Sequence, residues 1–354
     1  MTVQALSLPA LWGTFRTQVI GRKFARDVGI LTVANFVGAA LSFVQGILVA
    51  RWLGPELYGV AALVMSYPLL VYTFFDARSP EASVKYLSEF HVRNERDRAL
   101  AMCKLGYMVD SAIASLTFLV VLITAPWAAQ SVAHRPEAVG LIMIYAAAFV
   151  PNALIGTSCA ALMTLGRFVL IAWVDVLANF LRVTLVLGLV LTDWQVPGIV
   201  WGNAIATMAT GLLYGIIARV LIRRAWGVSP LQGAWSTLKG RRREIFSFLA
   251  YNDLNALLGM IPKQLDVALL GYFRNPMEVG YYRLAKNLAG AVSYAVRPLQ
   301  LVIYPDLVRL WGSGDQQIFR QKARRLLLQV GMPLGLAVLA GTPFVPFVLP
   351  SPGF

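Results

Sequence analysis

The sequence is poor in the residues from which enzymes and metalloproteins build reactive sites. Its 354 residues include two cysteines and two histidines, and none of the four stands at a metal-ligand or disulfide spacing. Cys103 and Cys159 fall on different predicted helices, and His91 and His134 are each isolated. We therefore expect no metal, no cofactor, no disulfide framework and no catalytic residue.

Charged residues are also scarce, at 14% of the chain, whereas 58% of the residues are hydrophobic. Such a composition is not that of an ordinary soluble domain. Nine apolar segments account for it, and each has the roughly 20 residues that a helix needs to cross a membrane. The expected fold is therefore an all-α, polytopic membrane protein. The segments lie at 28–50, 57–75, 105–127, 138–163, 168–192, 196–218, 246–273, 279–305 and 326–349.

The basic residues are distributed unevenly between these segments. Of the 31 Lys and Arg, 23 lie before the first segment or in every second gap after it, and three lie in the alternate gaps. By the positive-inside rule, the N-terminus and the basic gaps are cytoplasmic, which predicts a multi-pass protein of the inner (cytoplasmic) membrane. Attraction to anionic lipid headgroups explains the net charge of +14, so we expect no nucleic-acid partner.

Four regions are expected along the chain. Residues 1–27 form a cytoplasmic leader, either an interfacial amphipathic helix or a disordered basic segment. Residues 28–222 form an N-terminal six-helix bundle, and residues 223–245 form a cytoplasmic linker. Residues 246–354 form a partial C-terminal bundle of about three helices.

The division into halves depends on an internal repeat. The turn Leu53-Gly54-Pro55-Glu56-Leu57-Tyr58-Gly59 and the turn from Leu270 to Tyr282 each place Leu-Gly at the end of one helix, followed by a glutamate and a glycine beside an aromatic residue. Their offset of about 217–221 residues predicts two halves of six helices. About nine of twelve helices are then present, and we expect the last three to be missing beyond Phe354. A re-entrant tail is the alternative.

The gaps that face away from the basic residues are very short, at about 51–56, 128–137, 193–195 and 274–278. A membrane-embedded glycosyltransferase or polymerase usually needs an extramembrane lobe for its donor or acceptor. These gaps leave no length for one, so an enzyme of this kind is the least favoured alternative.

Three stretches carry a resemblance to a known family. LVARWLGPELYGVAALVMSYPLL (48–70) resembles the signature of the first two helices of polysaccharide (O-antigen and exopolysaccharide) flippases. LDVALLGYFRNPMEVGYYRLAKNLA (265–289) is similar to the matching signature of their seventh and eighth helices, and YPDLVRL (304–310) to the motif that closes the eighth. The turn Asp76-Ala77-Arg78-Ser79-Pro80 departs from the usual Asp-aliphatic-Gly type.

The resemblance implies a V-shaped pair of bundles around a central cavity that opens alternately to the two faces of the membrane. The implied substrate is an undecaprenyl-pyrophosphate-linked oligosaccharide, flipped from the cytoplasmic to the periplasmic leaflet for surface polysaccharide biosynthesis. The implied assembly is a monomer in the lipid bilayer, with polysaccharide polymerase or export proteins as further partners. A multidrug or other lipid exporter on the same scaffold is the alternative.

Charged residues inside the eighth segment give the first candidate site. Arg283, Lys286 and Arg297 occupy a sector of about 60° on an ideal helix, and guanidinium groups suit the oxygens of a pyrophosphate. We therefore expect them to bind the substrate. In the alternative interpretation, Arg297 pairs with Asp253 or Asp266, and Arg283 extends to the external interface.

The other candidates lie in the seventh and fifth segments. Lys263 and Asp266 are three residues apart and either pair with each other or face the cavity, where Asp266 and Asp253 would bind a coupling ion. Asp175 and Arg182 share a helix face but lie about 10 Å apart along the axis. Each therefore needs a partner elsewhere, across the cavity.

The balance of these charges favours an anionic cargo. The segments contain five basic residues and four acidic ones, whereas an exporter of cationic drugs would show the opposite bias. The basic residues are Arg182, Lys263, Arg283, Lys286 and Arg297, and the acidic ones are Asp110, Asp175, Asp253 and Asp266.

Overall fold

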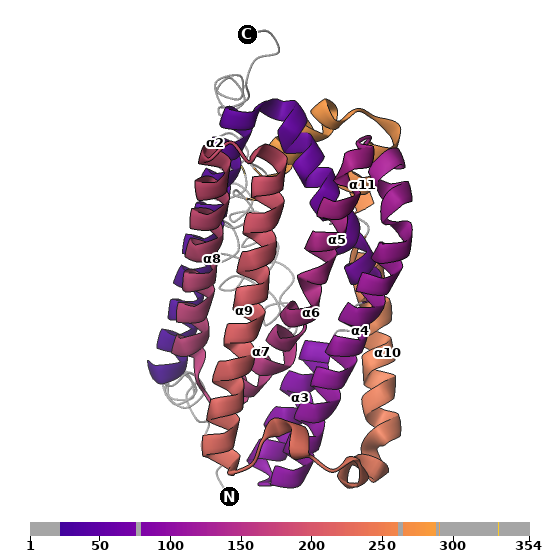
Figure 1. Cartoon of the computed structure of the whole chain (residues 1–354). Coiled ribbons are helices and arrows are strands. Elements are labelled where there is room, and N and C mark those ends of the chain that lie inside the picture. Colours follow the sequence, from indigo (N-terminus) through magenta and orange to yellow (C-terminus); the bar gives the residue numbers. More distant parts are fainter. Residues whose placement is uncertain (1–21, 76–78, 261–264, 288–289, 291–331, 333–354) are drawn as a thin grey trace, which may run out of the picture.

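The computed structural model describes residues 22–75, 79–260, 265–287, 290 and 332. Every regular element in these ranges is a helix, so the all-α expectation is confirmed. Figure 1 shows the long helices running side by side between two ends of the molecule. Most of the predicted leader and most of the eighth and ninth segments lie outside the described residues.

The first two apolar segments lie on one element, α2 (Arg22–Phe75), which is interrupted at the predicted turn. The interruption is Gly54, whose φ of 78° and ψ of 167° are not helical. A positive φ is accessible to glycine without strain, and Pro55 directly after it suits the first turn of a new helix. The sequence Gly54-Pro55 therefore separates two membrane helices within α2.

The next four apolar segments are also helical. The third is α4, the fourth is broken at its middle around Pro151, and the fifth and sixth are α8 and α9. Proline removes a backbone donor and clashes with the preceding turn, which explains the break. The bounds are α4 (Arg96–Ser131), η1 (Pro136–Ala138), α5 (Val139–Ala147), α6 (Phe149–Asn152), α7 (Leu154–Thr164), α8 (Phe168–Leu191) and α9 (Gln195–Trp226).

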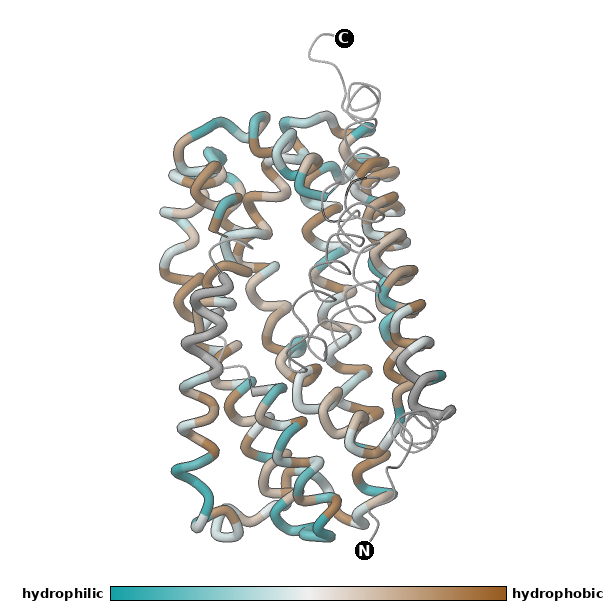
Figure 2. The backbone as a smooth tube through the Cα atoms, turned by 180° about the vertical axis from the view of Figure 1, so that it is seen from behind, coloured by the Kyte–Doolittle hydropathy of each residue, from teal (hydrophilic) through white to brown (hydrophobic). Residues whose placement is uncertain are grey.

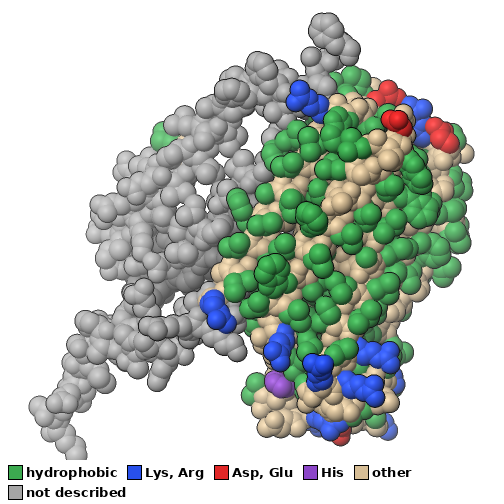
Figure 3. Space-filling model, turned by 60° about the vertical axis from the view of Figure 1, so that its left-hand side comes forward, with side chains coloured by type: hydrophobic (Ala, Val, Ile, Leu, Met, Phe, Trp, Pro, Cys, Tyr) green, Lys and Arg blue, Asp and Glu red, His purple; other side chains and the backbone are tan. Residues whose placement is uncertain are grey.

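The outer surface of these helices is apolar. Five stretches are long and apolar enough to cross a membrane, with the two parts of α2 counted as one. Ile123, Trp173 and Ile216 are 80%, 67% and 62% exposed, which a soluble monomer rarely tolerates over so wide an area. Figure 2 shows that hydrophobic residues predominate along the helices, and Figure 3 shows an apolar surface between the two ends with most of the visible Lys and Arg at one of them. The chain is a multi-pass membrane protein.

Helix α3 (Ser79–Val92) begins at the Ser-Pro-Glu signal and lies at the basic end of the bundle. After α9, Gly227 ends the helix in the left-handed conformation, with φ 72°. The linker then forms η2 (Pro230–Gln232) and η3 (Trp235–Arg241) against α4. It leads into α10 (Arg242–Met260), followed by α11 (Asp266–Phe273) and a helix at 276–287.

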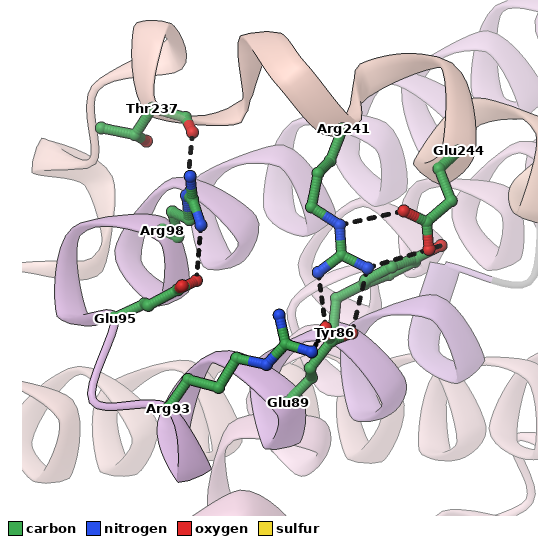
Figure 4. Close-up of polar contacts among 8 residues, drawn as sticks. All are labelled: Tyr86, Glu89, Arg93, Glu95, Arg98, Thr237, Arg241 and Glu244. Atoms are coloured by element: carbon green, nitrogen blue, oxygen red, sulfur yellow. Dashed lines mark hydrogen bonds and ion pairs between the residues drawn. The ribbon is translucent and has the colours of Figure 1, made fainter.

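A charged cluster fastens the start of α10 to α3 (Figure 4). The Arg241 guanidinium donates to Glu89 at 2.6 and 3.2 Å and to Glu244 at 2.9 Å through both Nε and Nη2. These hydrogen bonds lower the pKa of both carboxyl groups and raise the pKa of Arg241. The Tyr86 hydroxyl also donates to Glu244, and burial, assisted by that carboxylate, raises the pKa of Tyr86 to about 12.

The pKa directions in this cluster predict how it responds to acid. The pKa of each carboxyl group is lower in the folded chain than its usual value of 4.5. Each ionised carboxylate therefore stabilises the folded chain at pH values above 4.5, and this contribution is lost as the pH falls through the folded-state pKa. We expect hydrogen-exchange protection of the first turns of α10, corrected for intrinsic rates, to hold at pH 5 to 7 and to fall below that range.

The variant Arg241→Gln should lose several-fold in protection at neutral pH and lose the acid dependence with it. Arg242→Gln is the matched control, because Arg242 donates to the carbonyl of Trp235 and to neither carboxylate. Unchanged protection in Arg241→Gln would mean that apolar packing of α10 alone holds this end together.

Candidate functional site

A polar cavity of about 270 Å³ lies where α2, α8, α9 and the helix at 276–287 meet. The first half of the chain and the segment after the linker therefore both contribute to it. Its walls are largely small or apolar, with polar side chains from each of the four helices. The lining residues are Ser42, Gln45, Gly46, Val49, Tyr58, Ala61, Ala62, Met65, Arg182, Ile199, Asn203, Arg283 and Asn287.

The cavity is cationic. Arg182 of α8 and Arg283 of the helix at 276–287 both line it, and none of the described lining residues is acidic. Within the described part of the chain, neither guanidinium forms an ion pair, and the Arg182 Nε atom is buried with no hydrogen-bond partner. Placing positive charge away from water without a counter-charge is costly. An anionic ligand would remove that cost.

Amide and hydroxyl groups surround the two arginines. The Asn287 amide donates to the Tyr58 hydroxyl at 3.0 Å, which joins the helix at 276–287 to α2. The Asn203 amide donates to the backbone carbonyl of Ile199 at 2.8 Å, and the buried Oε1 atom of Gln45 has no partner in the described structure. Groups of this kind donate and accept, as sugar hydroxyls require.

Packing between α2 and α8 sets the position of Arg182. A Cβ atom on Gly38 would lie 2.7 Å from the Asn179 side chain, so the two helices approach closely one turn before Arg182. Asn179 in turn donates to the backbone carbonyl of Asp175 at 2.8 Å. The guanidinium is therefore presented by a helix that is anchored along its length.

The cationic stripe expected on the eighth segment is divided by the structure. Arg283 lines the cavity, but Lys286 does not. Lys286 Nζ instead contacts both carboxylate oxygens of Asp266, at 2.8 and 2.6 Å. Residues 283 and 286 differ by about 60° around a helix, which is enough to direct one toward the cavity and the other toward α11. The structure thus places Lys286 outside this cavity, and its role as a substrate ligand stays a prediction. Arg297 lies outside the described residues.

Asp266, a candidate for ion coupling, is engaged in the same contact. Besides Lys286, it accepts hydrogen bonds from the Tyr282 hydroxyl at 2.5 Å and from the backbone N–H of Val267 at 2.7 Å. Its charge is therefore neutralised by the neighbouring helix. Lys263, the partner expected from the sequence, lies outside the described residues, as does the side chain of Asp253.

Asp175 and Arg182 have separate surroundings, although they share a helix face. The Asp175 carboxylate accepts a hydrogen bond from the Tyr214 hydroxyl of α9 at 2.6 Å and does not line the cavity. Its partner thus comes from the adjacent packed helix rather than from across the cavity. Asp175 therefore lies outside this cavity, its role in ion coupling stays a prediction, and Arg182 is the charged residue of α8 in the described lining.

Sequence reasoning missed several lining residues. Tyr58 lies in the first of the two repeated turns, and Asn287 lies one helical turn after Arg283, so both had a positional signal. Asn203 is an isolated polar residue in an otherwise apolar segment, which in a membrane helix is itself a reason for attention.

Comparison with known proteins agrees with this geometry. Residues 24–311 match the family described as polysaccharide biosynthesis protein. The chain belongs to this family. A curated member, the probable low-salt glycan biosynthesis flippase Agl15 of Haloferax volcanii, is 24% identical over 110 residues. That match covers 31% of this chain and 23% of Agl15, so the chain spans about a quarter of the length of this relative.

The fold of this chain also resembles that of a solved structure. An inward-facing multidrug resistance transporter of the MATE family, in the MOP superfamily, superposes with a TM-score of 0.60 at 15% identity. The likeness covers 88% of this chain and 71% of that one. At this identity the likeness concerns the fold alone, and it agrees with the all-α, polytopic membrane fold expected from the sequence.

Proposed function

We propose that this protein is a transporter, not an enzyme, that flips an undecaprenyl-pyrophosphate-linked oligosaccharide from the cytoplasmic to the periplasmic leaflet of the inner membrane. The observation that carries the proposal is the cavity lined by Arg182 and Arg283, in which no acidic residue is found among the lining residues that the structure describes. The family to which the chain belongs and the flippase name of its curated relative support the same class of activity.

The two arginines would bind the pyrophosphate. A planar guanidinium makes paired hydrogen bonds with phosphate oxygens, and such charge-assisted bonds are stronger in surroundings from which water is excluded. Because the arginines come from α8 and from the helix at 276–287, one headgroup would bridge both sides of the cavity. Release would then follow when the two sides move apart.

The amide and hydroxyl groups of the cavity would contact the first sugars. Asn203, Asn287, Tyr58 and Gln45 carry no charge, so they can replace water around hydroxyl groups without adding a barrier to release. The apolar outer faces of the helices leave the lipid tail in the bilayer. Alternation between the two membrane faces would move the headgroup, as in other transporters built from repeated halves.

The charge of the cavity distinguishes this proposal from export of cationic drugs. Two arginines without a neighbouring carboxylate repel a cation, whereas they attract phosphate. Action as a monomer and cooperation with polysaccharide polymerase or export proteins are further parts of the proposal, as the family resemblance implies.

Reconstitution tests the proposal. Purified protein in liposomes is expected to move a fluorescent polyprenyl-pyrophosphate oligosaccharide across the bilayer, measured as protection of the label from an impermeant quencher, faster than protein-free liposomes do. A cationic dye tested in the same vesicles should not be transported. Dye transport without lipid movement would support the multidrug alternative, and absence of both would contradict the proposal.

A further inference from the structure

Two glycines form an unusually close backbone contact between α2 and the helix at 276–287. A Cβ atom placed on Gly59 would lie 1.8 Å from the carbonyl oxygen of Pro276 and 2.9 Å from the backbone nitrogen of Gly280. A Cβ atom placed on Gly280 would lie 2.0 Å from the carbonyl oxygen of Pro55. No other residue type fits at either position in this conformation, because the atoms in the way are backbone atoms.

The contact is reciprocal, and its two sides are equivalent in sequence. In each turn a glycine stands four residues after a proline: Gly59 after Pro55, and Gly280 after Pro276. The two pairs are offset by 221 residues. Each glycine packs against the carbonyl of the proline that begins the other turn. The two repeated turns therefore meet each other across an approximate two-fold relation, as an isologous interface does between identical subunits.

The contact lies at the end of the bundle opposite the charged cluster of Arg241, Glu89 and Glu244. Figure 1 shows the break in α2 and the segment after α11 at one end, and η3 and α3 at the other. Arg283 follows Gly280 by one turn, Tyr58 directly precedes Gly59, and both line the cavity. The His134 ring also contacts the carbonyl of Gly271 at 2.7 Å at this end. The glycine contact therefore borders the cavity on the side predicted to be external.

The forces across the contact suit a joint that separates. Within the described chain, no ion pair connects the two turns, since Glu56 pairs with Arg135 and Glu278 with Arg274. Backbone van der Waals contact between small residues holds them, together with the apolar core that contains Val60 and Val279 and the Tyr58–Asn287 hydrogen bond. Such a contact is close but includes no charged group that would have to be separated from its partner.

We propose that the crossing of Gly59 and Gly280 is the external closure of the transport cycle and that it separates when the cavity opens outward. This inference rests on the alternating access of the proposed function but not on the identity of the substrate. A side chain at either glycine displaces the closed state alone, so it shifts the population toward outward opening.

Thiol labelling measures that shift without any substrate. Both native cysteines, Cys103 and Cys159, are free, so Cys103→Ala/Cys159→Ala gives a background for a single probe, Ser42→Cys, in the cavity. Intact cells are treated with an impermeant maleimide, and labelling is expressed relative to solubilised protein. With both glycines present, external labelling should be low. Gly59→Ala or Gly280→Ala should raise it roughly fivefold or more, as for a small overpacking penalty on one state.

The reciprocity provides a sharper criterion. Since both substitutions break one contact, the double variant should label little more than either single variant. Gly140→Ala is the matched control, because a Cβ atom at Gly140 would meet nothing within 4 Å and should change nothing.

Wild-type labelling in both folded alanine variants would overturn the inference, and so would equal labelling in Gly140→Ala. If both alanine variants fail to accumulate while Gly140→Ala accumulates normally, the crossing is a requirement of the fold and not a moving closure. Failure of lipid flipping in liposomes, with the labelling pattern intact, would contradict the proposed substrate and leave the closure standing.

Discussion

Replacing Arg182 or Arg283 with alanine is expected to reduce export of the glycan by about tenfold to a hundredfold. Each guanidinium would contribute charge-assisted hydrogen bonds to the pyrophosphate, and such bonds are worth about 1.5–3 kcal/mol. That energy corresponds to the expected range of loss. In cells, the measurement is surface polysaccharide per molecule of protein, with accumulation of the lipid-linked precursor inside.

Two further variants separate binding from folding. Arg283→Lys keeps the charge but loses the paired geometry, so it should retain part of the activity. Arg274→Ala removes a cation that lies outside the cavity and is 3.7 Å from Glu278, and it should export normally. Normal export by Arg182→Ala and Arg283→Ala at normal protein level would remove the cationic cavity from the mechanism.

Removing one member of the Lys286–Asp266 pair is expected to lower stability more than removing both. The side chains are 28% and 24% exposed, so an unpaired charge is only partly solvated. Lys286→Met alone or Asp266→Asn alone should each lower the free energy of unfolding by about 1–3 kcal/mol, less than for a fully buried pair. The double variant Lys286→Met/Asp266→Asn should be less destabilised than the sum of the two single variants, because it leaves no unpaired charge.

Thermal unfolding of purified protein and export in cells together decide the role of Lys286. If Lys286→Met lowers the unfolding temperature and reduces export only in proportion to the amount of protein, the ion pair positions the helix and does not bind substrate. If Lys286→Met instead abolishes export and leaves the midpoint unchanged, Lys286 binds substrate after all, as its place beside Arg283 in the sequence first indicated.

Much of the fold is predictable because membranes impose simple rules. Apolar runs long enough to span the membrane located six helices, and Gly54-Pro55 located the turn between the first two. Two further features have a local cause: Pro151 explains the break in the fourth segment, and Ser79-Pro80-Glu81 suits the start of α3. These features depend on local sequence alone, which is why they could be read without knowing how the helices pack.

The site was only partly predictable, because it depends on which faces meet. Arg283 and Lys286 lie too close in angle for sequence periodicity to separate, and the packing of the helix against α8 and α11 decides between them. Asp110, one of the four acidic residues counted in the segments, is buried and accepts a hydrogen bond from Thr157. The approach of α2 to α8 at Gly38, which helps position Arg182, leaves no periodic signal in the sequence.

Binding of a short polyprenyl pyrophosphate tests most directly whether the cavity holds the headgroup. Purified protein is titrated with farnesyl diphosphate, farnesyl monophosphate and farnesol, and the titration is repeated with Arg182→Gln/Arg283→Gln. We expect the diphosphate to bind the native protein most tightly and the double variant to weaken its binding by about tenfold or more, with farnesol unaffected. Equal affinity for all three ligands, or undiminished diphosphate binding by the double variant, would contradict a phosphate-binding cavity.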